Sequence, residues 1–117
     1  MDTFQELQRW YQSHCDGEWE HGHGMSIGTL DNPGWSVEID LTDTALAEQP
    51  FAEVQRLEPE TDWIHCRVRD GAFEGYGGPF MLEEILRVFL AWAAERKPAR
   101  GRGPTIGSRQ RRVAPYY

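Results

Sequence analysis

Two runs of alternating residues, separated by a short turn, constrain the fold of this chain more than any other feature. In residues 25–29 and 35–41, apolar or β-branched side chains occupy every second position. This period of two is typical of strands with one buried face. Between the runs lies Asp31-Asn32-Pro33-Gly34, where proline presets one turn dihedral and glycine accepts a positive φ. We expect an antiparallel hairpin here.

Helical periodicity flanks the alternating region on both sides. Residues 3–14 and residues 82–93 each carry apolar side chains at spacings of three and four, which predicts two amphipathic helices. Pro79 suits the first turn of the second helix, and Pro98 is expected to close it.

Three further strands are expected between the hairpin and the second helix, over residues 51–57, 63–69 and 72–76. In the clearest of them, one set of side chains faces the core (Ile64, Cys66 and Val68) and the other faces away (Trp63, His65, Arg67 and Arg69). The order of helix, four or five strands and helix predicts a single α+β domain. Its sheet should be a meandering antiparallel one, with the N-terminal and C-terminal helices packed on one face and the other face left for recognition.

Charge divides the chain of 117 residues into two parts. Nineteen acidic residues and seven Lys or Arg residues give residues 1–97 a formal charge of −12, whereas residues 98–117 carry five Arg and no acid. We expect a folded domain over 1–97 and a basic Arg/Gly/Pro tail over 98–117 that is mobile or loosely docked. The acidic body should repel nucleic acid and anionic membranes and attract a basic protein partner, so that only the tail could bind nucleic acid.

The sequence also indicates a compartment. Asp2 and Glu6 follow Met1 where a secretory signal would carry basic and then apolar residues, and no apolar run is long enough to span a membrane. Cys15 and Cys66 alone do not form a disulfide scaffold. A cytoplasmic location is expected.

One cluster of residues could carry chemistry. Cys15, His21 and His23 are of zinc-ligand type, with His65 or Cys66 as a fourth ligand, although their spacing matches no standard zinc module. A thiolate beside an imidazole would suit a cysteine nucleophile. A small metal-binding or thiol enzyme is therefore the alternative to a binding protein without cofactor.

Two tryptophans are placed differently from the other three. Trp19 lies between Glu18 and Glu20, and Trp63 follows Asp62 and shares a strand face with charged residues. Partial exposure is expected for both. Exposed tryptophan among acidic residues is typical of a protein-binding hot spot.

Several motifs together resemble those of the immunity protein 53 family of bacterial polymorphic toxin systems. They cover roughly residues 7–95 and comprise Trp10-Tyr11, Cys15-Asp16-Gly17-Glu18-Trp19-Glu20-His21, Gly24, Thr29-Leu30-Asp31-Asn32-Pro33-Gly34-Trp35, Asp62-Trp63, Gly75 to Pro79 and Leu82-Glu83-Glu84-Ile85-Leu86. The resemblance implies an antitoxin without catalytic residues, which binds a toxin domain encoded beside it and blocks it stoichiometrically. Many such toxins are nucleases with a basic cleft, which an acidic body could occupy as a phosphate mimic. The expected contact residues are Glu18, Trp19, Glu20, Asp62 and Trp63, with Asp31 and Glu38 as weaker candidates.

Overall fold

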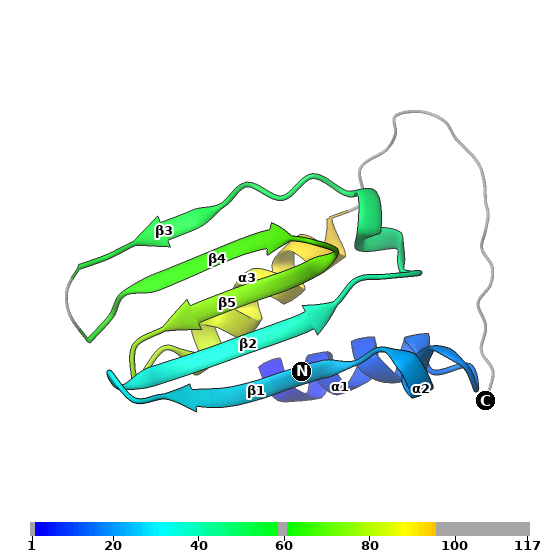
Figure 1. Cartoon of the computed structure of the whole chain (residues 1–117), viewed down its shortest axis with the longest axis horizontal. Helices are drawn as coiled ribbons and strands as arrows, with labels where there is room; N and C mark the ends of the chain where they lie inside the picture. Colours follow the sequence, from blue (N-terminus) through cyan, green and yellow to red (C-terminus); the bar gives the residue numbers. More distant parts are fainter. Residues whose placement is uncertain (1, 59–60, 96–117) are drawn as a thin grey trace.

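A computed structural model describes residues 2–58 and 61–95 and shows the α+β architecture that the sequence predicts (Figure 1). The elements in chain order are α1 (Thr3–His14), α2 (Trp19–Gly22), β1 (Met25–Leu30), β2 (Gly34–Asp40), the 3-10 helix η1 (Ala45–Glu48), β3 (Val54–Arg56), β4 (Ile64–Arg69), β5 (Ala72–Gly77) and α3 (Leu82–Ala94). The tail expected over 98–117, and Pro98 with it, lies outside the described residues. Pro79 lies in the turn before α3 and not in its first turn, because α3 begins at Leu82.

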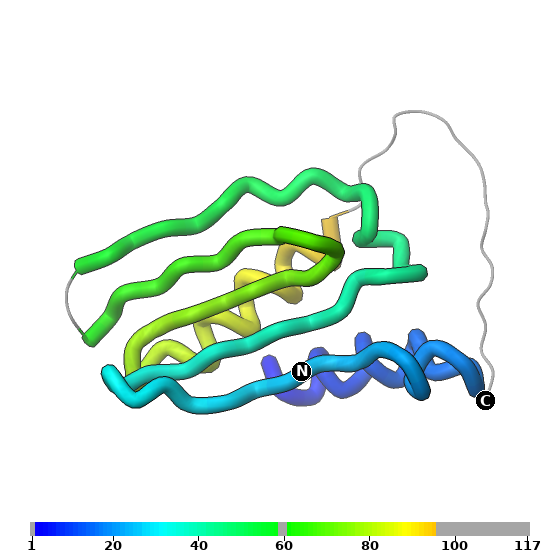
Figure 2. Tube along the Cα trace, in the orientation of Figure 1, coloured from blue at the N-terminus to red at the C-terminus, as the bar shows by residue number. Residues whose placement is uncertain are grey.

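The five strands form one antiparallel sheet in the order β1-β2-β5-β4-β3 (Figure 2). This order corrects the expected simple meander, because β2 pairs with β5 and not with β3. The physical reason lies in the side chains. β5 places Phe73, which is fully buried, opposite Ile39 of β2, whereas β3 has only three residues and exposes Gln55 and Arg56. The more apolar strand therefore takes the central position.

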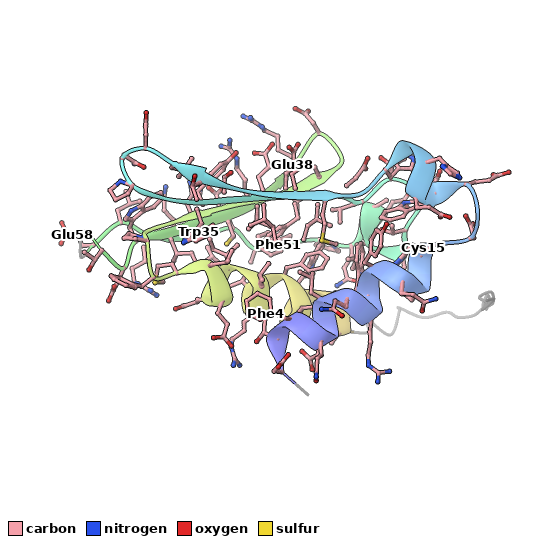
Figure 3. All side chains as sticks on the ribbon, turned by 90° about the horizontal axis from the view of Figure 1, so that it is seen from below. Phe4, Cys15, Trp35, Glu38, Phe51 and Glu58 are labelled. Carbon is pink, nitrogen blue, oxygen red and sulfur yellow. The ribbon has the colours of Figure 1, made fainter. Side chains whose placement is uncertain are left out.

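Both long helices cover the same face of the sheet, as expected. Figure 3 shows α1 and α3 on one side and no helix of similar length on the other. The core between the layers is built from alternate strand residues and the apolar stripes of the helices; its fully buried members include Val37, Ile39, Leu41, Ile64, Cys66, Phe73, Ile85, Leu86 and Phe89. None of the described helices is long and apolar enough to cross a membrane.

Two strand glycines allow close packing. A Cβ on Gly75 would collide with the side chain of Ile85, so the glycine lets α3 lie close to the central strand. A Cβ on Gly34 would collide with the carbonyl oxygen of Gly77 on the neighbouring strand. The expected positive φ at Gly34 is wrong, since Gly17 and Gly71 are the glycines with positive φ in the described part of the chain. Gly34 is required by the closeness of two strands.

Candidate partner-binding face

The sheet face opposite α1 and α3, which we call the open face, carries almost all the polar side chains of the strands. Strand register and alternation place on it Ser26, Ser36, Glu38, Asp40, His65, Arg67, Arg69, Glu74 and Tyr76. In Figure 3 the side chain of Glu38 lies on the side away from the helices. The strand expected over 63–69 begins at Ile64, and its predicted orientation is confirmed over 64–69, because Ile64 and Cys66 are buried in the core and His65 and Arg67 are half-buried on the open face.

A row of charges crosses the centre of the open face. Glu38 of β2 lies opposite Glu74 of β5, which in turn lies opposite Arg67 of β4. The Glu74 carboxylate accepts a 2.8 Å hydrogen bond from Arg67 Nε and lies 3.8 Å from Arg69 Nη2. That hydrogen bond raises the pKa of Arg67, and burial opposes the rise. Glu74 is thus neutralised, whereas Glu38 is exposed and has no ion-pair partner among residues 2–58 and 61–95.

A depression of about 480 Å³ lies at the end of the open face where β2 ends and the β4–β5 turn begins. Its lining includes the carboxylates of Glu38, Asp40 and Asp70 and the imidazoles of His21 and His23, and none of its described lining residues is Lys or Arg. The depression is therefore acidic at neutral pH, and a cationic group is the chemistry that it suits.

Hydrogen bonds hold Asp40 in its place at the edge of this depression. His23 Nδ1 lies 2.7 Å from Asp40 Oδ2, and the Thr42 N–H donates to Asp40 Oδ1 over 2.9 Å. Partial burial works to raise the pKa of Asp40, but the hydrogen bonds from Thr42 and His23 outweigh it and hold that pKa below its usual value. Asp40 is consequently a carboxylate whenever the protein is near neutral pH.

The segment from Asp16 to Glu20 folds into a self-capped loop. Asp16 Oδ1 accepts hydrogen bonds from the N–H groups of Glu18 and Trp19, and these bonds lower the pKa of Asp16. Glu20 reaches back to accept from the N–H groups of Asp16 and Gly17, at 3.0 and 2.9 Å. Gly17 has a φ of 96°, which L-residues rarely adopt. The carboxylates of Asp16 and Glu20 therefore stabilise the loop. The Glu18 side chain is exposed, so its carboxylate is available to a partner.

The expectation of an exposed Trp19 is wrong. Its side chain is 6% exposed, its indole N–H donates to the carbonyl of Thr42 over 2.8 Å, and its ring packs edge-on to Trp10. Two neighbouring carboxylates suggested exposure, but Glu20 turns back to accept the N–H groups of Asp16 and Gly17, and Glu18 is the exposed N-cap of α2. Trp19 thus joins α2 to the core.

Three of the remaining expected contact residues lie at the opposite end of the sheet. Asp31 is exposed in the β1–β2 turn, and Asp62 is exposed just before β4. Trp63 is half-buried next to Asp62, as expected, and its carbonyl accepts the N–H of Gly78. The structure therefore does not gather the expected residues into one cluster. In Figure 1, α2 lies near one end of the sheet, and the β1–β2 turn and the start of β4 lie near the other. Glu18 and Glu20 therefore belong to the first end and Asp31, Asp62 and Trp63 to the second, while Glu38 lies within β2.

The alternative metal or thiol site is not supported by the geometry. Among the described residues no group of three or more His, Cys, Asp or Glu side chains is placed to hold a metal ion. Cys15 caps α1 and its thiol donates to the carbonyl of Tyr11, whereas His23 pairs with Asp40, so Cys15, His21 and His23 do not converge. Cys66 is buried in the core, and this burial, with a contribution from Glu84, raises the pKa of its thiol to about 12. Neither thiol is placed as a nucleophile.

Three residues of the open face were missing from the expected contact set. Asp40 lies two residues after Glu38 on the same strand face, so the period of two could have identified it. Asp70 was visible only as a turn residue, and its φ of 55° fits that role. Tyr76 lies opposite His65 because β5 is a central strand, and nothing in the short segment 72–76 indicated that position.

The comparisons with known proteins agree with the resemblance in the motifs. The family model described as immunity protein 53 matches residues 4–94, a range that runs from α1 to the end of α3 and includes the whole open face. No curated protein and no solved structure matches the chain significantly. Because the family model covers well over half of the sequence, the chain belongs to the immunity protein 53 family.

Proposed function

We propose that the protein is an antitoxin that binds the toxin domain encoded beside it and blocks that domain stoichiometrically, without catalysis, in the cytoplasm of the producing cell. The observation that carries this proposal is the open face. It is the one broad face of the sheet that neither α1 nor α3 covers, and it carries Glu38, which lines the acidic depression and has no ion-pair partner in the described part of the chain.

The charge of this face indicates the kind of toxin surface that it fits. Glu38, Asp40 and Asp70 line a depression whose described lining contains no Lys or Arg, within a body of net negative charge, and only Asp70 of the three lies near an arginine, 3.9 Å from Arg69 Nε. Complementary charge raises the association rate and selects against wrong partners. A toxin with a basic active-site cleft, as in a nuclease, would place its cations on these carboxylates in the way it places them on phosphates.

Aromatic side chains on the same face can supply the apolar part of the contact. Tyr76 is half-buried on the open face, and Trp63 is half-buried directly before β4, where alternation with the buried Ile64 directs it to the same side, so each presents part of a ring to a partner. Large aromatic side chains desolvated at the centre of an interface carry much of the binding energy. We include Trp63, Asp62 and Asp31 in the proposed contact surface together with Glu38 and Glu18, and we assign Trp19 and Glu20 to the loop that supports it.

The proposal is tested by titrating the purified toxin domain with the full-length protein and following the toxin's own activity. Stoichiometric inhibition predicts that residual activity falls linearly and reaches its floor at one antitoxin chain per toxin domain, and that the complex weakens as salt increases. Full toxin activity at a large excess of the protein would refute the proposed function. A sub-stoichiometric end point would refute occlusion and indicate that the protein inactivates the toxin catalytically.

A further inference from the structure

The outer edge of β1 is a long strand edge without the usual protection against pairing. β1 is the first strand in the sheet order, and in the described part of the chain nothing pairs with its outer side. Its sequence, MSIGTL, contains no charged residue and no proline. Natural edge strands are usually short, charged, bulged or covered, because an open row of N–H and C=O groups invites another strand.

The opposite edge of the same sheet shows that protection. β3 has three residues, and Gln55 and Arg56 are exposed on it. Arg56 also forms an ion pair with Glu84 at 3.7 Å. Short length and charge thus protect the β3 edge against pairing with another strand. In contrast, β1 has six residues, and the side chain of Ile27 on it is 42% exposed. The contrast within one sheet indicates that the β1 edge is kept available.

The groups that β1 presents can be identified from the ladder. The N–H of Asp40 donates to the carbonyl of Gly24, which makes Gly24 and Asp40 a hydrogen-bonded pair. Because such pairs alternate along an antiparallel ladder, the backbone groups of Met25, Ile27 and Thr29 point outward. Side chains at these three positions lie on the helix-covered face.

The helix beside this edge is apolar on its exposed flank. Phe4 and Tyr11 of α1 are 47% and 39% exposed and lie seven residues apart, on one side of the helix. The Tyr11 ring contacts Trp19, in the segment that leads into β1, so this side of α1 is turned toward the β1 edge. Figures 1 and 3 both show α1 as the helix that lies along the β1 side of the sheet.

We propose that this surface, the β1 edge with Phe4 and Tyr11, binds a second copy of the chain by antiparallel β1–β1 pairing. Residues 3–14 contain one Glu and one Arg and β1 contains neither, so this region is neutral within an acidic body. A basic partner finds no net charge to bind in these two elements, whereas two identical copies bring no excess of like charge from these elements into contact. With Ile27 opposite Ile27 of the second copy, Met25 lies opposite Thr29 and all outward N–H and C=O groups find partners.

Such pairing has a geometric consequence. The two-fold axis of an antiparallel pair within one sheet is perpendicular to that sheet. The two sheets therefore continue into a single one, and both open faces point to the same side. The helices α1 of the two copies would meet on the other side and cover Phe4 and Tyr11.

Sedimentation velocity of the full-length protein over a concentration series tests the pairing. We expect a species of twice the 13.5 kDa chain mass. Thr29→Lys places a charge in the shared ladder and should raise the dimer dissociation constant at least about tenfold. Gln55→Lys makes the same charge change on the other edge strand and should leave the constant unchanged. Circular dichroism melts establish that both variants fold.

Crosslinking tests the register. In a Cys15→Ser background, Ile27→Cys should form an intermolecular disulfide under mild oxidation, since identical positions face each other only at residue 27, whereas Thr29→Cys should not. A monomer at every concentration, or a dimer that Thr29→Lys and Gln55→Lys weaken equally, would overturn the proposal. A monomer whose toxin binding is lost on Thr29→Lys alone would overturn it in favour of a toxin strand on this edge.

Discussion

The indole N–H of Trp19 donates a 2.8 Å hydrogen bond to the carbonyl oxygen of Thr42. These residues lie far apart in the sequence, Trp19 in α2 and Thr42 two residues after the end of β2. The ring of Trp19 also contacts Trp10 and His23, so a single side chain joins α1, α2 and the end of β2. This tie fixes α2 beside the acidic depression, where His21 forms part of the lining.

Truncating this tie should destabilise the fold. Trp19→Ala removes a buried ring and leaves a cavity, which costs about 3–5 kcal/mol of unfolding free energy. Trp19→Phe keeps most of the ring but leaves the Thr42 carbonyl without this donor, at a cost of about 1–3 kcal/mol. Urea denaturation measures both. Phe80→Ala, which truncates an exposed side chain, is the reference. If Trp19→Ala lowered the unfolding free energy by less than Phe80→Ala does, the structural role of Trp19 would be contradicted.

The packing of α3 on β5 predicts a contrast between two strand glycines. Gly75→Ala forces Ile85 and the start of α3 away from the sheet, which should cost about 1–3 kcal/mol of stability. Gly28→Ala lies on the open face, where the nearest atom to a new Cβ is Ser36 Oγ at 3.7 Å, so it should be tolerated. Thermal melts of the two variants provide the comparison. If Gly75→Ala and Gly28→Ala had equal melting temperatures, the close contact between Gly75 and Ile85 would be contradicted.

Burial of His14 predicts a stability loss on mild acidification. Burial lowers the pKa of His14 below its ordinary value of 6.5, although its hydrogen bond to the Trp10 carbonyl and the charge of Asp16 act in the opposite direction. The unfolded chain then binds a proton more readily than the folded one, so stability decreases as the pH falls from about 6.5 toward the lower folded pKa. His14→Gln should make the pH dependence of the unfolding free energy shallower in this range. An unchanged slope would contradict the assignment.

Trp63 should contribute to toxin binding rather than to folding alone. Trp63→Ala removes an aromatic side chain from the open face and should weaken toxin binding by at least about 2 kcal/mol while the domain stays folded. Phe80→Ala is the matched control, because Phe80 is 81% exposed in the turn that leads into α3 and not on the open face. Calorimetric titration of both folded variants with the toxin domain gives the result. Equal affinities would exclude Trp63 from the interface.

Local pattern was sufficient for most elements. The period of two at residues 35–41 predicted strand β2 correctly. It also predicted which of its side chains are buried, namely those of Val37 and Ile39, because side-chain alternation depends only on neighbouring residues. The central position of β5 could not be read in this way. It depends on Phe73 and Gly75 fitting against Ile39 and Ile85, which are contacts between residues remote in the sequence.

The candidate site was predictable to a smaller extent, for a related reason. The orientation of Glu38 follows from alternation along β2 and was expected, and that of Trp63 follows from its position directly before the buried Ile64 of β4. The burial of Trp19 was not, because the partner that satisfies its N–H is Thr42, and only the three-dimensional fold brings that carbonyl to the indole. The two neighbouring acids made Trp19 look exposed in the sequence. In the structure Glu20 accepts backbone N–H groups of the preceding loop, and Glu18 is the N-cap of the short helix α2.

In the proposed function the open face binds the toxin through its acidic charge, above all that of Glu38, and one paired measurement tests this most directly. Affinity for the purified toxin domain is compared between Glu38→Lys, on the open face, and Glu6→Lys, which makes the same charge change on an exposed position of α1. We predict that Glu38→Lys weakens binding at least about tenfold and that Glu6→Lys leaves it within about twofold of the parent. Equal affinities of the two variants, or a larger loss for Glu6→Lys, would contradict the account.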